Sequence, residues 1–270
     1  MIKHNIRGLN VAEFGEQNKL AIVFIHAFPF CNRMWDKQVE TLQQSFRVIA
    51  PDLRGFGYSE LGDGLFTIDT HVSDLISVID SLQLEKPIVC GLSMGGYIVL
   101  RALELYQPKF RGVIVADTKS EADTNPFKVK RSEQIQMIRN GQRDLFTENF
   151  VKAALSEKNY AEKPELVDFL KKMISWQKDQ AIMSALLTMA ARTDTTELLE
   201  KIDIPVLVIA GKDDRLTPPE YAKIIYGKTK NSELAIIPDA GHLPNLENPD
   251  EFNKAVLEFM KEFKPKEQAA

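Results

Sequence analysis

A serine set among glycines is the first place where a side chain of this sequence could do covalent chemistry. Ser93 stands in the stretch Gly91-Leu-Ser-Met-Gly95, which follows an apolar run at 87–90 and precedes a helical pattern. This spacing fits the G-x-S-x-G turn, in which a strand bends at once into a helix and lifts the hydroxyl above the sheet edge. Gly91 and Gly95 would be needed because side chains there would crowd each other. The alternative is a glycine-rich turn whose serine only caps the helix.

A nucleophilic serine needs a base that takes its proton and an acid that orients the base. His242 follows the last predicted strand and lies downstream of Ser93, which is the chain order expected of the base. The acid should lie between them in the chain. Asp213 and Asp214 follow the preceding strand, and Asp117, at the end of an earlier strand, is a third candidate. The remaining histidines are not favoured as the base: His4 in an N-terminal hairpin, His26 in a loop and His71 on a solvated helix face.

The negative oxygen that forms when a serine attacks a carbonyl needs two backbone N–H donors. Met94, the residue after the serine, would supply one of them. The second should come from the loop after the predicted strand at 20–25, where Phe28 is the natural donor. Pro29 has no N–H and helps to shape this loop, and His26 is better suited to anchoring the loop than to catalysis.

Short apolar runs alternate with amphipathic helical patterns along most of the chain. The runs are nearly continuous, as expected for parallel strands covered on both faces; they lie at 20–25, 47–50, 87–90, 112–116, 205–210 and 233–238. The opening segment predicts a hairpin at the edge of the sheet. From 119 to 199 strand signals vanish and helical segments follow one another, at 131–140, 145–154, 164–175 and 179–191. The sequence therefore predicts an α/β sheet interrupted by a helical insertion.

We interpret the chain as an α/β core with an inserted helical cap. The core comprises 1–118 and 200–264, the cap comprises 119–199, and 265–270 is expected to be a flexible tail. A cap over the site would hold the residues that choose the substrate, and the candidates are Trp176, Met183, Leu187 and Met189. Methionine and tryptophan at helical spacing also serve helix packing, which is the alternative for each of them.

Composition and charge disfavour several classes of function. The 270 residues carry a net charge of −4, and no basic block is present of the kind that binds nucleic acids or anionic membranes. No HExxH, CxxC, Walker or dinucleotide-binding pattern occurs, so we expect no metal, nucleotide or flavin cofactor. The N-terminus lacks the apolar core of a signal peptide. Cys31 and Cys90 are expected to be reduced thiols of a cytoplasmic protein, whose oligomeric state is left open.

Together these residues resemble the α/β-hydrolase superfamily over nearly the whole chain. Further motifs carry the likeness: His26-Ala-Phe-Pro29, Pro51-Asp-Leu-Arg-Gly-Phe-Gly-Tyr-Ser59 and Ala240-Gly-His242. The chain most resembles the small carboxylesterases, the 3-oxoadipate enol-lactonases and the cofactor-free perhydrolases. The resemblance implies a mostly parallel eight-stranded sheet flanked by helices, with the helical cap inserted between core strands.

The resemblance also bears on two individual positions. Related folds show G-x-x-D-x-x-x-P in the loop that precedes the histidine, and this pattern matches Gly211, Asp214 and Pro218. The match favours Asp214 over Asp213 as the acid. The family usually has glycine after the histidine of the oxyanion loop, whereas this chain has Ala27, whose methyl group narrows the loop slightly.

The function that the resemblance implies is hydrolysis of a small-molecule carboxylic ester or lactone through an acyl-enzyme on Ser93. Serine at this turn argues against haloalkane dehalogenase and epoxide hydrolase chemistry, for which the fold uses aspartate. The alternatives with the same triad are carbon–carbon bond hydrolysis, enol-lactone hydrolysis specifically, and a small-molecule receptor with little turnover. The motifs specify neither the acyl-chain length nor a perhydrolase side activity.

Overall fold

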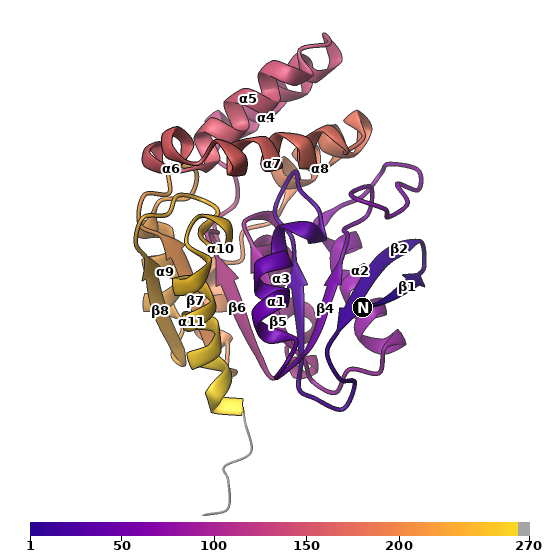
Figure 1. Cartoon of the computed structure of the whole chain (residues 1–270), viewed down its shortest axis with the longest axis vertical. Helices are drawn as coiled ribbons and strands as arrows, with labels where there is room; N and C mark the ends of the chain where they lie inside the picture. Colours follow the sequence, from indigo (N-terminus) through magenta and orange to yellow (C-terminus); the bar gives the residue numbers. More distant parts are fainter. Residues whose placement is uncertain (264–270) are drawn as a thin grey trace, which may run out of the picture.

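One mixed β-sheet runs through the centre of the molecule, with helices on both faces (Figure 1). The computed structural model describes residues 1–263, and the strands of this part form an eight-stranded sheet in the order β1-β2-β4-β3-β5-β6-β7-β8. The strands are β1 (Ile2–Ile6), β2 (Leu9–Phe14), β3 (Ala21–Ile25), β4 (Arg47–Pro51), β5 (Ile88–Leu92), β6 (Gly112–Ala116), β7 (Val206–Gly211) and β8 (Ser232–Ile237). β1 and β2 form the expected antiparallel hairpin, and β4, β3, β5, β6, β7 and β8 run parallel. The predicted α/β fold is therefore confirmed.

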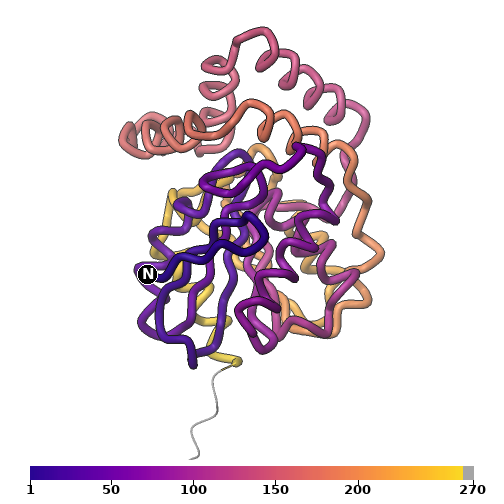
Figure 2. The backbone as a smooth tube through the Cα atoms, turned by 90° about the vertical axis from the view of Figure 1, so that its right-hand side faces the viewer, coloured from indigo at the N-terminus to yellow at the C-terminus, as the bar shows by residue number. Residues whose placement is uncertain are grey.

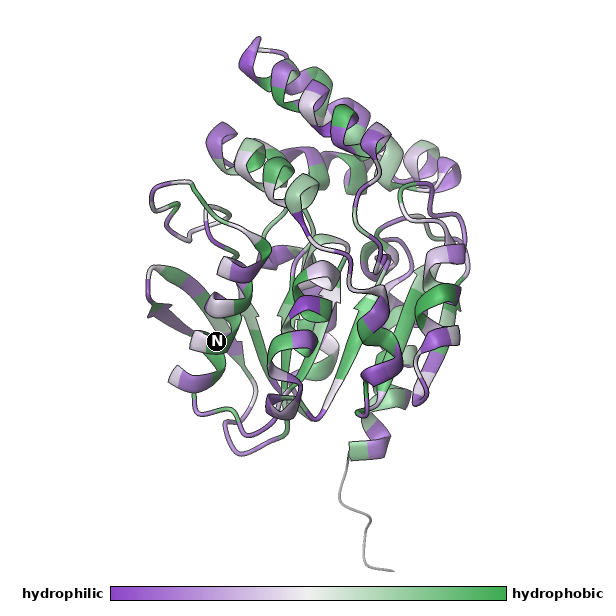
Figure 3. Ribbon diagram, turned by 180° about the vertical axis from the view of Figure 1, so that it is seen from behind, coloured by the Kyte–Doolittle hydropathy of each residue, from purple (hydrophilic) through white to green (hydrophobic). Residues whose placement is uncertain are grey.

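Burial explains why the central strands are so apolar. Every residue of β3, β4, β5, β6 and β7 is buried, so both faces of these strands need hydrophobic side chains (Figure 3). β8, at the other edge of the sheet, is only partly buried. Because these strands are parallel, the loops that follow β3, β5, β6, β7 and β8 all leave the same edge of the sheet. That edge is where separate sequence motifs can meet.

Core helices cover the two faces of the sheet. α1 (Asp36–Leu42) and α11 (Pro249–Met260) pack together on one face, and α2 (Ile68–Ser81) and α3 (Met94–Tyr106) pack together on the other (Figures 1 and 2). The remaining core elements are α9 (Pro219–Lys228), α10 (Pro244–Glu247) and the 3-10 turns η1 (Asn32–Trp35), η2 (Gln107–Lys109), η3 (Thr196–Lys201) and η4 (Lys261–Phe263). Within residues 1–263, no helix has the length and hydrophobicity needed to span a membrane.

The chain between β6 and β7 forms a layer of helices above the carboxyl ends of the strands (Figure 1). Its helices are α4 (Asn125–Arg139), α5 (Arg143–Ala154), α6 (Glu157–Glu162), α7 (Pro164–Ser175) and α8 (Asp179–Ala191). They fall inside the interval 119–199 that the sequence assigns to the cap. α4 begins earlier than its periodicity predicts because a proline is tolerated in the first turn. The tail predicted at 265–270 lies outside the described residues.

Hydrogen bonds tie α8 of the cap to the core loop that follows β4. Ser184 Oγ donates to the carbonyl of Gly64 at 2.7 Å, and Thr188 Oγ1 donates to the carbonyl of Phe66 at 2.6 Å. Each bond joins a cap helix to a backbone segment of the core. The cap is thereby held over the edge of the sheet where the loops converge.

The two cysteines are buried and unpaired, in line with the reduced thiols expected from the sequence. Cys31 and Cys90 form no disulfide with each other. Burial raises the pKa of Cys31 to about 12 and the pKa of Cys90 well above its ordinary value. Neither side chain therefore has the thiolate character of a reactive cysteine.

His71 in α2 is buried, whereas the sequence places it on a solvated helix face. The segment before α2 covers it, and its ring lies against that of Phe66 with 4.9 Å between the centroids. Neither ring nitrogen has a hydrogen-bond partner among the described residues. Burial, with the charges of His26 and Arg54, lowers the pKa of His71 to about 3. The neutral ring is therefore the form that fits the folded protein.

We expect the variant His71→Leu to lose less stability in acid than the wild type. Below about pH 6.5 the unfolded chain binds a proton at this side chain, whereas the folded protein binds it only near pH 3. Wild-type stability is therefore lost as the pH falls from about 6.5 towards 3. Urea unfolding at about pH 7 and pH 4.5 measures this, and the wild-type midpoint should fall further than that of the variant. Equal falls would contradict the prediction.

Candidate active site

The backbone at Ser93 makes the sharp corner that the glycine pattern predicts. Ser93 has φ 55° and ψ −111°, between the end of β5 and the start of α3. A Cβ on Gly91 would lie 2.3 Å from the carbonyl oxygen of Gly95, and a Cβ on Gly95 would lie 2.3 Å from that of Ile25. Both glycines are therefore required by close backbone contacts. The corner also brings the turn Gly91–Gly95, called the elbow below, against the end of β3.

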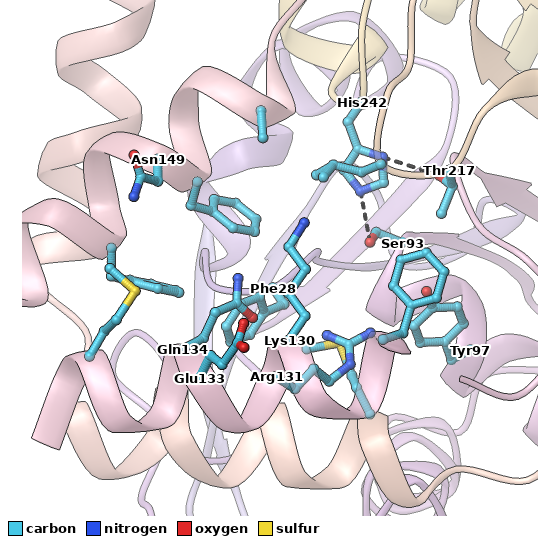
Figure 4. A pocket seen from close by; sticks show the side chains of 17 residues that line it. Phe28, Ser93, Tyr97, Lys130, Arg131, Glu133, Gln134, Asn149, Thr217 and His242 are labelled. Carbon is cyan, nitrogen blue, oxygen red and sulfur yellow. Dashed lines mark hydrogen bonds between the residues drawn. The ribbon is translucent and has the colours of Figure 1, made fainter. Parts of the chain in front are cut away.

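A chain of hydrogen bonds links the three side chains proposed as a triad. Ser93 Oγ lies 2.9 Å from His242 Nε2 (Figure 4), and His242 Nδ1 lies 2.8 Å from Asp214 Oδ2. These residues come from the loops after β5, β8 and β7, and Asp214 and His242 are buried. The arrangement can pass a proton from the serine hydroxyl to the imidazole while the carboxylate holds the ring.

The turn around Asp214 stabilises its negative charge. The N–H groups of Leu216 and Thr217 donate to Oδ1 at 2.8 and 3.1 Å, and Thr217 Oγ1 donates to Oδ2 at 2.7 Å. Burial by itself raises the pKa of this carboxyl, but the charge and hydrogen bond of His242 and the bonds from Thr217 outweigh it, so the pKa is lowered. Asp214 is thus suited to remain ionised beside the histidine.

The other two acid candidates are placed differently. Asp213 is exposed, and its backbone N–H bonds to the carbonyl of Ala240. Asp117 is buried beside Asp214, but Oδ1 accepts from the N–H of Gly211 at 2.8 Å instead of contacting the histidine. Thr217, which no sequence argument singled out, supports the acid. Its place directly before Pro218 in the acid loop is the signal that could have found it.

The loop after β3 lies beside the elbow, where an oxyanion hole is expected. His26 anchors this loop, since its Nε2 accepts from the N–H of Leu53 at 2.9 Å and its Nδ1 therefore donates to the carbonyl of Ala27, also at 2.9 Å. Ala27 lies outside the left-handed region, so alanine fits here without strain. Phe28 follows in the loop, and Met94 is the first residue of α3. Neither of these two amides donates to another group of residues 1–263, and their role as oxyanion donors stays a prediction.

Comparison with known proteins identifies the family. The model of the alpha/beta hydrolase family matches residues 22–255. The chain belongs to this family. 3-Oxoadipate enol-lactonase 1 of Acinetobacter baylyi is 30% identical over 254 residues, which cover 94% of this chain and 93% of that protein. A thermophilic esterase from Thermogutta terrifontis, solved with malate bound, is 31% identical with a TM-score of 0.90, over 97% of this chain and 98% of that one.

The likeness to small esterases and enol-lactonases that the sequence indicated is thereby confirmed. The enol-lactonase from Burkholderia xenovorans LB400 has a TM-score of 0.88 at 23% identity, over 96% of this chain and 100% of that one. At this identity the similarity supports the fold alone.

A cavity of about 290 Å³ opens between the sheet edge and the cap of this α/β hydrolase (Figure 4). Ser93 and His242 lie at its base. Its apolar wall is largely aromatic and comprises Phe28, Tyr97, Phe127, Phe146, Phe150, Met137, Ala153, Met189 and Leu216. Polar and charged groups complete the lining: Lys130, Arg131, Glu133, Gln134, Asn149 and Thr217. Ser93 therefore faces a small cavity that is lined by both apolar and charged side chains.

Of the four cap residues predicted to contact substrate, only Met189 lines this cavity. Trp176 is half exposed between Arg33 and Lys172, whose cationic groups lie 5.7 and 6.0 Å from its ring centroid. Leu187 is 60% exposed, and Met183 packs on the hydrophobic core. These three expectations are corrected. Trp176 lies at the C-terminal end of α7, outside the cavity lining. α8 turns the stripe Ile182, Ala185, Leu186 and Met189 inward, so Leu187 faces solvent.

One group of side chains in the described part of the chain could ligate a metal ion. Asp117, Asp214 and His242 each offer one atom, and these atoms lie within 4.8 Å of one another. Asp214 and His242 already share a direct hydrogen bond of 2.8 Å. The group is therefore better explained as the acid and base of a triad with a second carboxyl beside them.

The space around Gly95 and around Gly227 differs, so replacing each with alanine should have opposite effects on stability. In Gly95→Ala the new Cβ would meet the backbone of Ile25, so we expect stability to fall by about 2 kcal/mol or more, with loss of any activity. Gly227 in α9 has open space around it, and Gly227→Ala should raise stability by up to about 1 kcal/mol. Urea unfolding of both variants tests the pair, and a Gly95→Ala variant as stable as the wild type would refute the steric argument.

Proposed function

We propose that this α/β hydrolase cleaves carboxylic esters or lactones of small molecules through an acyl-enzyme on Ser93. The observation that carries the proposal is the hydrogen-bonded chain from Ser93 through His242 to Asp214 at the base of a cavity. A purely structural serine would not need an imidazole within hydrogen-bond distance and a stabilised carboxylate behind it. The proposed reaction uses no cofactor.

The proposed mechanism follows from the positions of these side chains. Ser93 Oγ attacks the carbonyl carbon while His242 Nε2 takes its proton, and Asp214 stabilises the resulting imidazolium. The amides of Phe28 and Met94 would hold the negative oxygen. His242 then gives the proton to the leaving alcohol, and water attacks the acyl-enzyme by the same path in reverse. For a lactone, the alcohol stays attached to the acyl group throughout, and the water step releases a single hydroxy acid.

The cavity indicates which substrates to try first. Its volume of about 290 Å³ suits a compact acyl or alcohol group more than a long chain. Aromatic rings from Phe28, Phe146 and Phe150 pack edge to face at its wall, which favours an apolar or aromatic part. Lys130 and Arg131 also line it; since Arg131 pairs with Asp123, Lys130 is the cation that a carboxylate on the substrate would meet.

A lactone is the second candidate substrate class. Two relatives of about 30% identity over most of this chain are named 3-oxoadipate enol-lactonases. The same triad opens a cyclic ester and an open-chain ester, so the triad does not choose between them. A panel that includes both kinds of ester decides the preference.

We expect Ser93→Ala to lower kcat/KM for a short p-nitrophenyl ester by at least about a thousandfold, because the nucleophile is lost. Ser45→Ala, an exposed serine far from the cavity, serves as the matched control and should keep wild-type turnover. The measurement is initial rates on a panel of short and long esters, with and without a carboxylate, and of lactones. Near wild-type turnover in Ser93→Ala would overturn the mechanism. Tight binding with negligible turnover by the wild type would indicate a receptor.

A further inference from the structure

Asp117 is a second buried carboxyl at the active site that the proposed mechanism does not use. It directly follows β6 and has φ 43°, a left-handed conformation that costs energy for any residue other than glycine. Its N–H continues the sheet by bonding to the carbonyl of Ile209 at 2.9 Å. The strained backbone aims the side chain under the loop that carries Asp214, where Oδ1 accepts from the N–H of Gly211 at 2.8 Å.

The second oxygen of this carboxyl has no donor. Asp117 is fully buried, and Oδ2 has no hydrogen-bond partner within the described part of the chain. An ionised carboxylate left in this way would pay a large desolvation cost. A protonated carboxyl avoids this desolvation cost, because it is uncharged and its O–H can donate to a neighbouring acceptor.

The charged neighbours of Asp117 supply that acceptor and oppose a second negative charge. Two other acids face it, Asp214 and Glu247, together with His242 behind Asp214. Asp214 holds its charge through Thr217 and His242. Burial most strongly, and then the charge of Asp214, raises the pKa of Asp117 well above its usual range, against the smaller effect of the Gly211 N–H.

Glu247, unlike Asp117, is well supplied with hydrogen-bond donors. Its oxygens accept from the N–H groups of Gly241 and Ser156, at 2.8 and 2.9 Å, and from Asn159 Nδ2 at 2.8 Å. Among Asp117, Asp214 and Glu247, Asp117 alone combines full burial with an oxygen that lacks a hydrogen-bond donor. The proton therefore belongs on Asp117 and not on its neighbours.

We propose that Asp117 is a positioning residue of the triad, which remains protonated at neutral pH and donates a hydrogen bond from Oδ2 to the Asp214 carboxylate. The proposal rests on the proposed role of Ser93, His242 and Asp214. The hydrogen bond holds the acid in the orientation that directs the imidazole toward Ser93. It also leaves a single negative charge, that of Asp214, next to the histidine.

Infrared spectroscopy tests the proton directly and does not depend on catalysis. At neutral pH, the difference spectrum of wild type minus Asp117→Asn should contain the C=O stretch of a protonated carboxyl. Asp123→Asn is the matched control: Asp123 is also a fully buried aspartate of this segment, but Arg131 and Arg192 beside it outweigh burial and lower its pKa to about 2. Its difference spectrum should lack that band. Absence of the band for Asp117 would overturn the proposal whether or not the protein hydrolyses esters.

Kinetics test the positioning role. Asparagine keeps an acceptor for the Gly211 N–H and places an N–H donor where the O–H stood, whereas alanine removes both. We therefore expect Asp117→Ala to lower kcat about tenfold with KM little changed, and Asp117→Asn to restore most of that loss. In the plot of kcat/KM against pH, the pH at which activity falls on the acid side should be the same in Asp117→Asn as in the wild type, because the substitution removes no charge. An asparagine variant as impaired as alanine, or an acid-side fall that moves to lower pH, would contradict the proposal. A wild type that hydrolyses none of the panel would refute the proposed function and leave the infrared result standing.

Discussion

The backbone conformation of Ser93 is the constraint on which the rest of the site depends. Its φ of 55° and ψ of −111° belong to a sparsely populated region, and such a residue persists only when its surroundings over-determine it. Here β5 enters, α3 leaves and the end of β3 closes the third side, with Gly91 and Gly95 in backbone contact. The same contacts that hold the strained serine bring the loop of Phe28 beside it. The same contacts therefore determine both the exposure of the hydroxyl and the position of the loop that carries Phe28.

The electrostatics of the site follow from an unequal supply of hydrogen-bond donors. Three buried acids, Asp117, Asp214 and Glu247, crowd the carboxyl edge of β6, β7 and β8. If all were ionised in a medium of low dielectric, their repulsion would be costly. Asp214 and Glu247 are surrounded by N–H and O–H groups, whereas Asp117 has one such partner. The donors therefore decide which carboxyl faces the histidine as an anion, a feature that residue type alone does not show.

The sequence was sufficient for the core and for the placement of Ser93, Asp214 and His242, because parallel strands send their loops to one edge and the chain order is characteristic. It was insufficient for the cap. Helical periodicity shows which residues share a face but not which face turns toward the cavity, so Trp176 and Leu187 were misplaced. The aromatic wall comes from other helices, where Phe146 and Phe150, four residues apart in α5, stack on each other. Burial of His71 depended on a loop that covers it, which no local pattern encodes.

A buried cluster of ion pairs attaches α4 and the end of α8 to the core. Asp123, buried just before α4, forms ion pairs with Arg131 of α4, with Arg192 after α8 and with Lys119. Removing one partner of such a buried pair is costly, because the remaining charges stay desolvated. This cluster joins the first turns of α4 to the end of α8 and sets the cap beside Tyr97, over whose ring Arg192 lies at 3.9 Å. α5 is tied to the site at its other end, where the carbonyl of its last residue, Ala154, accepts from the backbone N–H of His242 at 2.8 Å.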